Sequence, residues 1–115
     1  MNAQMFIDSI KQVVIEDSIK SVQTNLDNPP GKKPVYELVQ LSEWFKSFDF
    51  ENQDMILKLV RESVQTSVFG FLCVLDGVRA IEDNEIKGRL KLIYEKGHES
   101  ILLNDLNKDY LHDLL

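Results

Sequence analysis

The stretch from Asp49 to Asp83 constrains the fold most strongly, because its apolar residues recur with the period of a helix. These residues recur at spacings of three and four, and Phe71 and Leu72 both take their spacing from Val68: Ile56, Val60, Val64, Val68, Phe71, Leu72, Leu75 and Val78. Asp49 can accept hydrogen bonds from free N–H groups at the start of a helix, and Glu51 and Asp54 suit the positive end of its dipole. We therefore predict one long helix from Asp49 to Asp83.

The middle of this stretch predicts a central position in the fold. Between Val68 and Leu75 apolar residues spread around the whole helix circumference, as in a helix buried on all sides. The run is too short to cross a bilayer, and charged residues follow it at once, so no membrane span is expected.

Small residues near the end of this stretch leave an alternative open. A strip of them shares one helix face and would let a neighbour approach the backbone: Ser63, Ser67, Gly70, Val74 and Gly77. In the alternative, Gly77 ends the helix and residues 68–75 form a buried strand.

The residues before Asp49 predict two further helical segments and a loop. Residues 2–26 carry two apolar stripes that are rotated apart, which indicates either different partners at the two ends or a break near Glu16, Asp17 and Ser18. Residues 28–34 contain three prolines and form a loop, in which Lys32 and Lys33 are candidate anion contacts. Val35–Phe48 is the next helix, with a narrow seam: Leu38, Leu41, Phe45 and Phe48.

The C-terminal third predicts a β-hairpin and a short helix. Residues 88–94 alternate as in a half-buried strand, residues 95–98 supply the turn around Gly97, and residues 100–103 return. Asn107 can cap a final helix that contains Tyr110 and Leu114. We predict a mostly helical α+β fold, in which N-terminal helices, the hairpin and the terminal helix pack on the long central helix.

Length and charge limit the organisation and the partners. A chain of 115 residues is expected to form a single domain, residues 1–115. Its net charge of −6 argues against nucleic-acid binding and suits a basic protein partner. Cys73 is the only cysteine, so no disulfide framework is expected. Early charged residues interrupt any signal sequence, which predicts a cytoplasmic protein.

The sequence contains no pattern that predicts catalysis or a cofactor. His98 and His112 lack the spacing of metal ligands, and no serine lies in a GxSxG motif. We therefore expect no catalytic residues, no metal site and no cofactor.

Two features are candidates for a binding site. On one helix, Asp76, Arg79 and Asp83 would share a face, and Glu82 would lie beside it. This group would form either a structural ion network or a recognition patch. Trp44 borders the seam of its helix, and an exposed tryptophan there would be a candidate anchor for a protein partner.

Four segments of the chain resemble a family of small uncharacterised bacterial proteins. The resemblance covers nearly the whole chain and is carried by four segments: residues 29–34 (PPGKKP), 42–45 (SEWF), 69–81 (FGFLCVLDGVRAI) and 111–114 (LHDL). It implies a single bacterial cytosolic domain and supplies no activity or site residues.

Three functions agree with these features. The first is a protein-interaction module, most concretely an immunity-type protein that neutralises a basic bacterial toxin by covering its active site. The second is a small-ligand binder or enzyme that uses the face formed by Asp76, Arg79 and Asp83, which requires a pocket there. The third is an accessory protein that pairs with itself as a homodimer.

Overall fold

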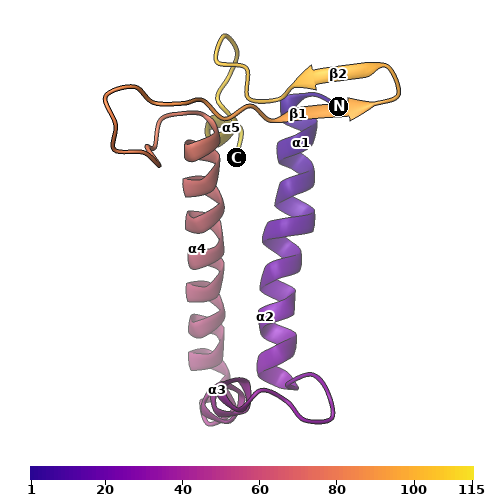
Figure 1. Cartoon of the computed structure of the whole chain (residues 1–115). Coiled ribbons are helices and arrows are strands. Elements are labelled where there is room, and N and C mark those ends of the chain that lie inside the picture. Colours follow the sequence, from indigo (N-terminus) through magenta and orange to yellow (C-terminus); the bar gives the residue numbers. More distant parts are fainter. The chain divides into compact units, whose positions relative to one another are not determined.

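A computed structural model describes residues 1–115, and it confirms the α+β class with helices first and a hairpin near the C-terminus (Figure 1). The elements follow in the order α1 (Ala3–Ile10), η1 (Lys11–Glu16), α2 (Asp17–Asp27), α3 (Tyr36–Lys46), α4 (Phe50–Leu75), β1 (Ile93–Lys96), β2 (Glu99–Leu102) and α5 (Leu111–Leu114). The contacts within the chain define two compact units. Unit 1 contains residues 1–12 and 66–115, and unit 2 contains residues 13–65.

The N-terminal helical stretch explains why its two apolar stripes do not share a face. Its backbone stays helical from Ala3 to Asp27, but η1 is a π-helix with wider turns than an α-helix. The extra residue in such a turn changes the spacing at which side chains share a face. Accordingly Val13, which belongs to the first stripe, is exposed, whereas Ile15 is buried.

In unit 2, α3 packs against α2, and a short hydrogen bond joins the two helices. The Ser42 hydroxyl donates to the carbonyl of Leu26 at 2.6 Å, which satisfies a backbone acceptor at the end of α2. Phe45 and Leu26 are both buried. Figure 1 shows α3 end-on and α2 from the side, so the two helices cross.

An ion pair also joins α4 to the end of η1 within unit 2. Arg61 donates from two guanidinium nitrogens to the two carboxylate oxygens of Glu16, at 2.6 and 3.1 Å. This hydrogen bonding holds the pKa of Glu16 below its ordinary value of 4.5 and raises the pKa of Arg61.

Helix α4 begins as predicted and ends earlier than predicted. Asp49 accepts from the backbone N–H of Asn52 at 3.0 Å, which confirms its capping role. The prediction that the helix continues to Asp83 is wrong, because α4 ends at Leu75. The alternative was right about Gly77 as the end of the helix and wrong about a strand, since residues 68–75 are helical.

Gly77 ends α4 because it adopts a backbone conformation that other residues rarely take. Its φ is +74°, in the left-handed region. The N–H of Gly77 then donates to the carbonyl of Val74 at 3.1 Å, and the N–H of Val78 donates to that of Cys73 at 3.0 Å. This pair of bonds is a Schellman motif, and it closes the helix.

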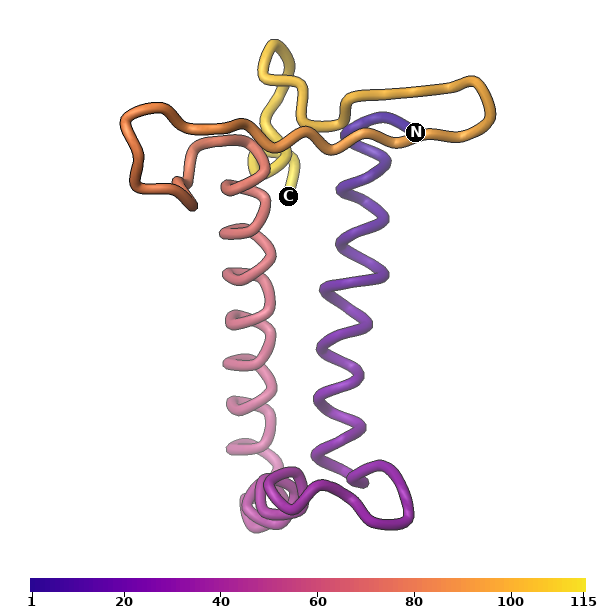
Figure 2. Tube along the Cα trace, in the orientation of Figure 1, coloured from indigo at the N-terminus to yellow at the C-terminus, as the bar shows by residue number.

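The core of unit 1 brings the two ends of the sequence together. Ile7 of α1, Leu72 of α4 and Leu111 of α5 form one buried cluster. Figure 2 follows the chain from the end of α4 through a long irregular segment before it reaches β1. The prediction that residues 68–75 are buried all round is wrong at Phe69 and Phe71, which are 46% and 63% exposed.

The hairpin is present, with a later start and a tighter turn than predicted. Strands β1 and β2 are antiparallel, and Lys96 pairs with Glu99 across a turn in which Gly97 has a φ of +58°. Residues 88–92, which were predicted as strand, are irregular. None of the helices is long and apolar enough to cross a membrane.

Candidate functional site

The C-terminal end of α4 is organised by the carboxylate of Asp76, which is only 3% exposed. Asp76 accepts from the backbone N–H groups of Leu111 and His112, at 3.0 and 2.9 Å, and also contacts Nδ1 of His112 at 2.7 Å. Asp76 therefore caps α5 from a distant position in the sequence. The predicted cap, Asn107, does not hold this helix, because the N-cap position is Tyr110.

The His112 ring is fixed on several sides. It stacks on Tyr110 with ring centres 5.4 Å apart, and it meets Phe69 edge-on at 5.5 Å. Its second ring nitrogen, Nε2, lies 3.4 Å from Oδ1 of Asp113. Both ring nitrogens thus face carboxylates, an arrangement that fixes the ring and anchors α5 to the end of α4.

Asn104 is a second buried polar residue at this end of α4, and no sequence pattern indicates its role. Its side-chain amide donates to the carbonyls of Leu75 and Leu90, at 2.6 and 2.9 Å, and its oxygen accepts from the N–H of Leu92 at 2.8 Å. Its own carbonyl accepts from Arg89 at 2.9 Å. Asn104 therefore holds the irregular segment before β1 against the last turn of α4.

The predicted polar face breaks up because α4 ends at Leu75. Asp76 is engaged by α5, whereas Glu82 and Asp83 lie in the irregular segment that follows and are exposed. Glu82 accepts from the backbone N–H of Gly88 at 2.8 Å and closes a local loop. Arg79 pairs with neither Asp76 nor Asp83.

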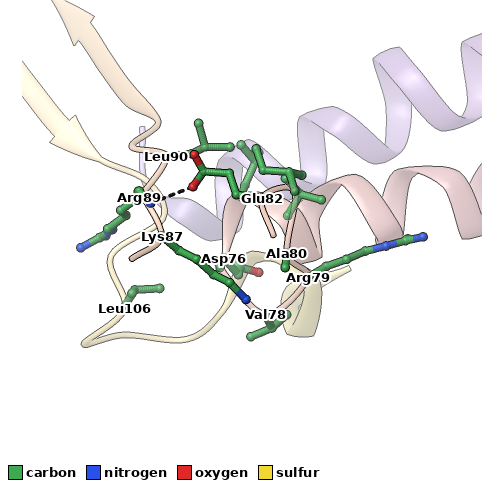
Figure 3. A pocket seen from close by; sticks show the side chains of 14 residues that line it. Asp76, Val78, Arg79, Ala80, Glu82, Lys87, Arg89, Leu90 and Leu106 are labelled. Atoms are coloured by element: carbon green, nitrogen blue, oxygen red, sulfur yellow. Dashed lines mark hydrogen bonds between the residues drawn. The ribbon is translucent and has the colours of Figure 1, made fainter. Parts of the chain in front are cut away.

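Arg79 instead lies over the backbone of α4. A methyl group built on Gly70 would come within 2.5 Å of a guanidinium nitrogen of Arg79. The close approach predicted for the strip of small residues is therefore made here by an arginine side chain. In Figure 3 this side chain points away from the neighbouring cavity and along α4.

A cavity of about 500 Å³ lies between the end of α4 and the irregular segment, all of it within unit 1. Three of the predicted site residues line it, namely Asp76, Arg79 and Glu82, while Asp83 does not. Figure 3 shows Lys87 directed inward, towards the region of Val78. A cavity therefore borders part of the face that the ligand-binding hypothesis uses, without Asp83.

Trp44 lies on a different surface, in unit 2. Its side chain is 50% exposed, and its ring meets Phe48 edge-on with centres 4.9 Å apart. Leu41, one helical turn before Trp44, is 48% exposed. We call the surface formed by Leu41, Trp44 and Phe48 the α3 stripe. Trp44 therefore lies in unit 2, whereas the other predicted binding residues lie in unit 1, namely Asp76, Arg79, Glu82 and Asp83.

Lys32 and Lys33, the candidate anion contacts, are exposed in the loop between α2 and α3. Neither lysine forms an ion pair with the protein. No group of three or more metal-ligating side chains occurs in the chain.

Comparison of the chain with family models, with curated proteins and with solved structures finds no match. The site is therefore interpreted from its own geometry. Two surfaces stand out, the α3 stripe and the cavity at the end of α4.

Proposed function

We propose that this protein acts by binding a protein partner through the α3 stripe. Trp44 supports this proposal most directly. A half-exposed indole leaves a large apolar area in water, and Phe48 holds the ring in place, so little side-chain entropy is lost on binding. Tryptophan is also enriched among the residues that dominate binding energy at protein interfaces.

The charges of α3 favour a basic partner, because Glu37 and Glu43 outnumber Lys46, its one cationic side chain. Glu37 and Glu43 are exposed on the same helix, and neither forms an ion pair. The whole chain has a net charge of −6. Long-range attraction of this kind accelerates association with a positively charged protein and fades as salt screens it. The most concrete version of the proposal is an immunity-type protein that covers the active site of a basic toxin.

Site-specific crosslinking tests the proposal. A photoreactive residue in place of Gln40, which is exposed beside Trp44 in the helix, should capture one partner in cells of the native organism. The substitution Trp44→Ala should weaken capture of that partner by about tenfold or more. The matched control is Phe71→Ala, which removes an aromatic ring that is 63% exposed and lies outside the stripe.

The outcomes separate the candidate functions. Loss of capture with Trp44→Ala but not with Phe71→Ala supports binding through the stripe. A basic captured protein whose toxicity is relieved by the wild-type chain supports the immunity version. Crosslinks to a second copy of this chain support the homodimer instead. Equal capture by both variants would overturn the proposal.

A further inference from the structure

We propose that the cavity at the end of α4 is a binding site for a small amphiphilic carboxylate, a molecule with one negative charge and an unbranched apolar body. The site belongs to unit 1 and is distinct from the α3 stripe. Most of its wall is apolar, and these side chains come from α4, the segment after it and the loop before α5: Val74, Leu75, Val78, Ile81, Leu90 and Leu106. Such walls favour an alkyl chain over a sugar or a nucleobase.

The cationic residues of the cavity supply the reason for a negative charge. Arg79, Lys87 and Arg89 line it, and none of them pairs with a carboxylate of the protein. A carboxylate in the cavity would pair with Lys87, whose ammonium is directed inward in Figure 3, by a charge-assisted hydrogen bond.

The acidic residues of the cavity oppose such a ligand less than their number suggests. The carboxylate of Asp76 is buried and is occupied by Leu111 and His112. One oxygen of Glu82 is occupied by the N–H of Gly88. Their negative charges are therefore partly balanced by donors that the protein already provides.

The arrangement of the cations indicates one negative charge rather than a polyphosphate. Only Lys87 points into the cavity in Figure 3, whereas Arg79 points away along α4. Arg89 donates to the carbonyl of Asn104, and its side chain is directed away from the cavity in Figure 3. The single inward-facing ammonium, that of Lys87, matches one carboxylate. A volume of about 500 Å³ is in the range of small-ligand pockets.

Titration with decanoate below its micelle concentration tests the site, with chemical shifts of the ¹⁵N-labelled full chain as the readout. We expect saturable shifts at residues that line the cavity, and decanol, which has no charge, should bind more weakly. Lys87→Gln should weaken decanoate binding at least about threefold and leave decanol unaffected. Lys108→Gln is the matched control, because it removes one exposed positive charge outside the cavity.

A second variant tests the apolar wall independently of the cations. Ile81→Glu places a negative charge on the wall and should abolish decanoate binding, while the exposed position of Ile81 keeps the fold intact. Shifts that spread over exposed apolar residues elsewhere, equal effects of Lys87→Gln and Lys108→Gln, or equal affinity for decanol would each overturn the proposal. So would the absence of any saturable shift.

Discussion

Asn104 is almost completely buried, and its side chain forms three hydrogen bonds to backbone groups. These bonds satisfy backbone groups that have no partner in a helix or strand. We predict that Asn104→Ala destabilises the protein by at least about 3 kcal/mol, because two carbonyls and one N–H lose their partner inside the protein. Urea unfolding measures this change. Asn107→Ala, at an exposed position close by, should change the free energy of unfolding by less than about 0.5 kcal/mol. Equal effects of the two substitutions would contradict this role.

Individual residues could be predicted from the sequence when their partners are close along the chain. Asp49 was recognised as a cap because its partner, Asn52, lies three residues away. Asn104 bonds Leu75 across 29 residues and Asp76 bonds His112 across 36, and no local pattern identifies such pairs. The predicted helix face of Asp76, Arg79 and Asp83 does not form, because α4 ends at Leu75 and the apolar periodicity alone does not indicate that end.

At the scale of elements, Gly77 decides where α4 ends. We predict that Gly77→Ala costs about 1–2 kcal/mol, because alanine disfavours the left-handed conformation at a φ of +74°. Thermal or urea unfolding measures the loss. Gly88→Ala is the control, since its new methyl group would make only an ordinary contact, 3.6 Å from Glu82, and its backbone is not left-handed. A larger loss at Gly88 than at Gly77 would argue against the Schellman motif.

The contact between η1 and α4 predicts a dependence of stability on pH. The hydrogen bonds from Arg61 lower the pKa of Glu16 in the folded state, so its contribution is present above the unfolded value of 4.5. The contribution is lost as the pH falls through the lower folded pKa. The urea midpoint of Glu16→Gln should therefore lie below that of the wild type at neutral pH, and the difference should shrink in acid.

The matched control for this ion pair is Glu43→Gln, at an exposed position without an ion-pair partner. Its difference from the wild type should be small and should not follow the same profile. A difference for Glu16→Gln that stays constant down to strongly acidic pH would show that the carboxylate does not act through Arg61.

Most elements could be predicted because they have strong periodicity, while their limits depend on backbone geometry. The rotated stripes of residues 2–26 indicated an irregularity, but a π-helical turn has no sequence pattern of its own. The strand at residues 88–94 was predicted from alternation. Only Ile93 and Tyr94 of that range lie in β1, because the carbonyl of Leu90 and the N–H of Leu92 are bonded to the side chain of Asn104.

At the scale of the whole molecule, the expectation of a single domain leads to a measurable prediction. Helix α4 supplies residues to both units, and so does the helical stretch from Ala3 to Asp27. Since unfolding either unit would remove the support of helices that the other uses, we predict one cooperative transition. Trp44 fluorescence reports on unit 2, and the amide signal of Asn104 reports on unit 1. Separate urea midpoints for these two probes would show two independent domains.

The core cluster of Ile7, Leu72 and Leu111 also has a consequence for synthesis on the ribosome. Unit 2 is one continuous segment, residues 13–65, so its contacts become available midway through translation. The cluster in unit 1 has to wait until Leu111 has been made, and Ile7 therefore spends most of translation without its partners. A nascent chain of this protein would thus expose its first helix as a target for chaperones until Leu111 has been synthesised.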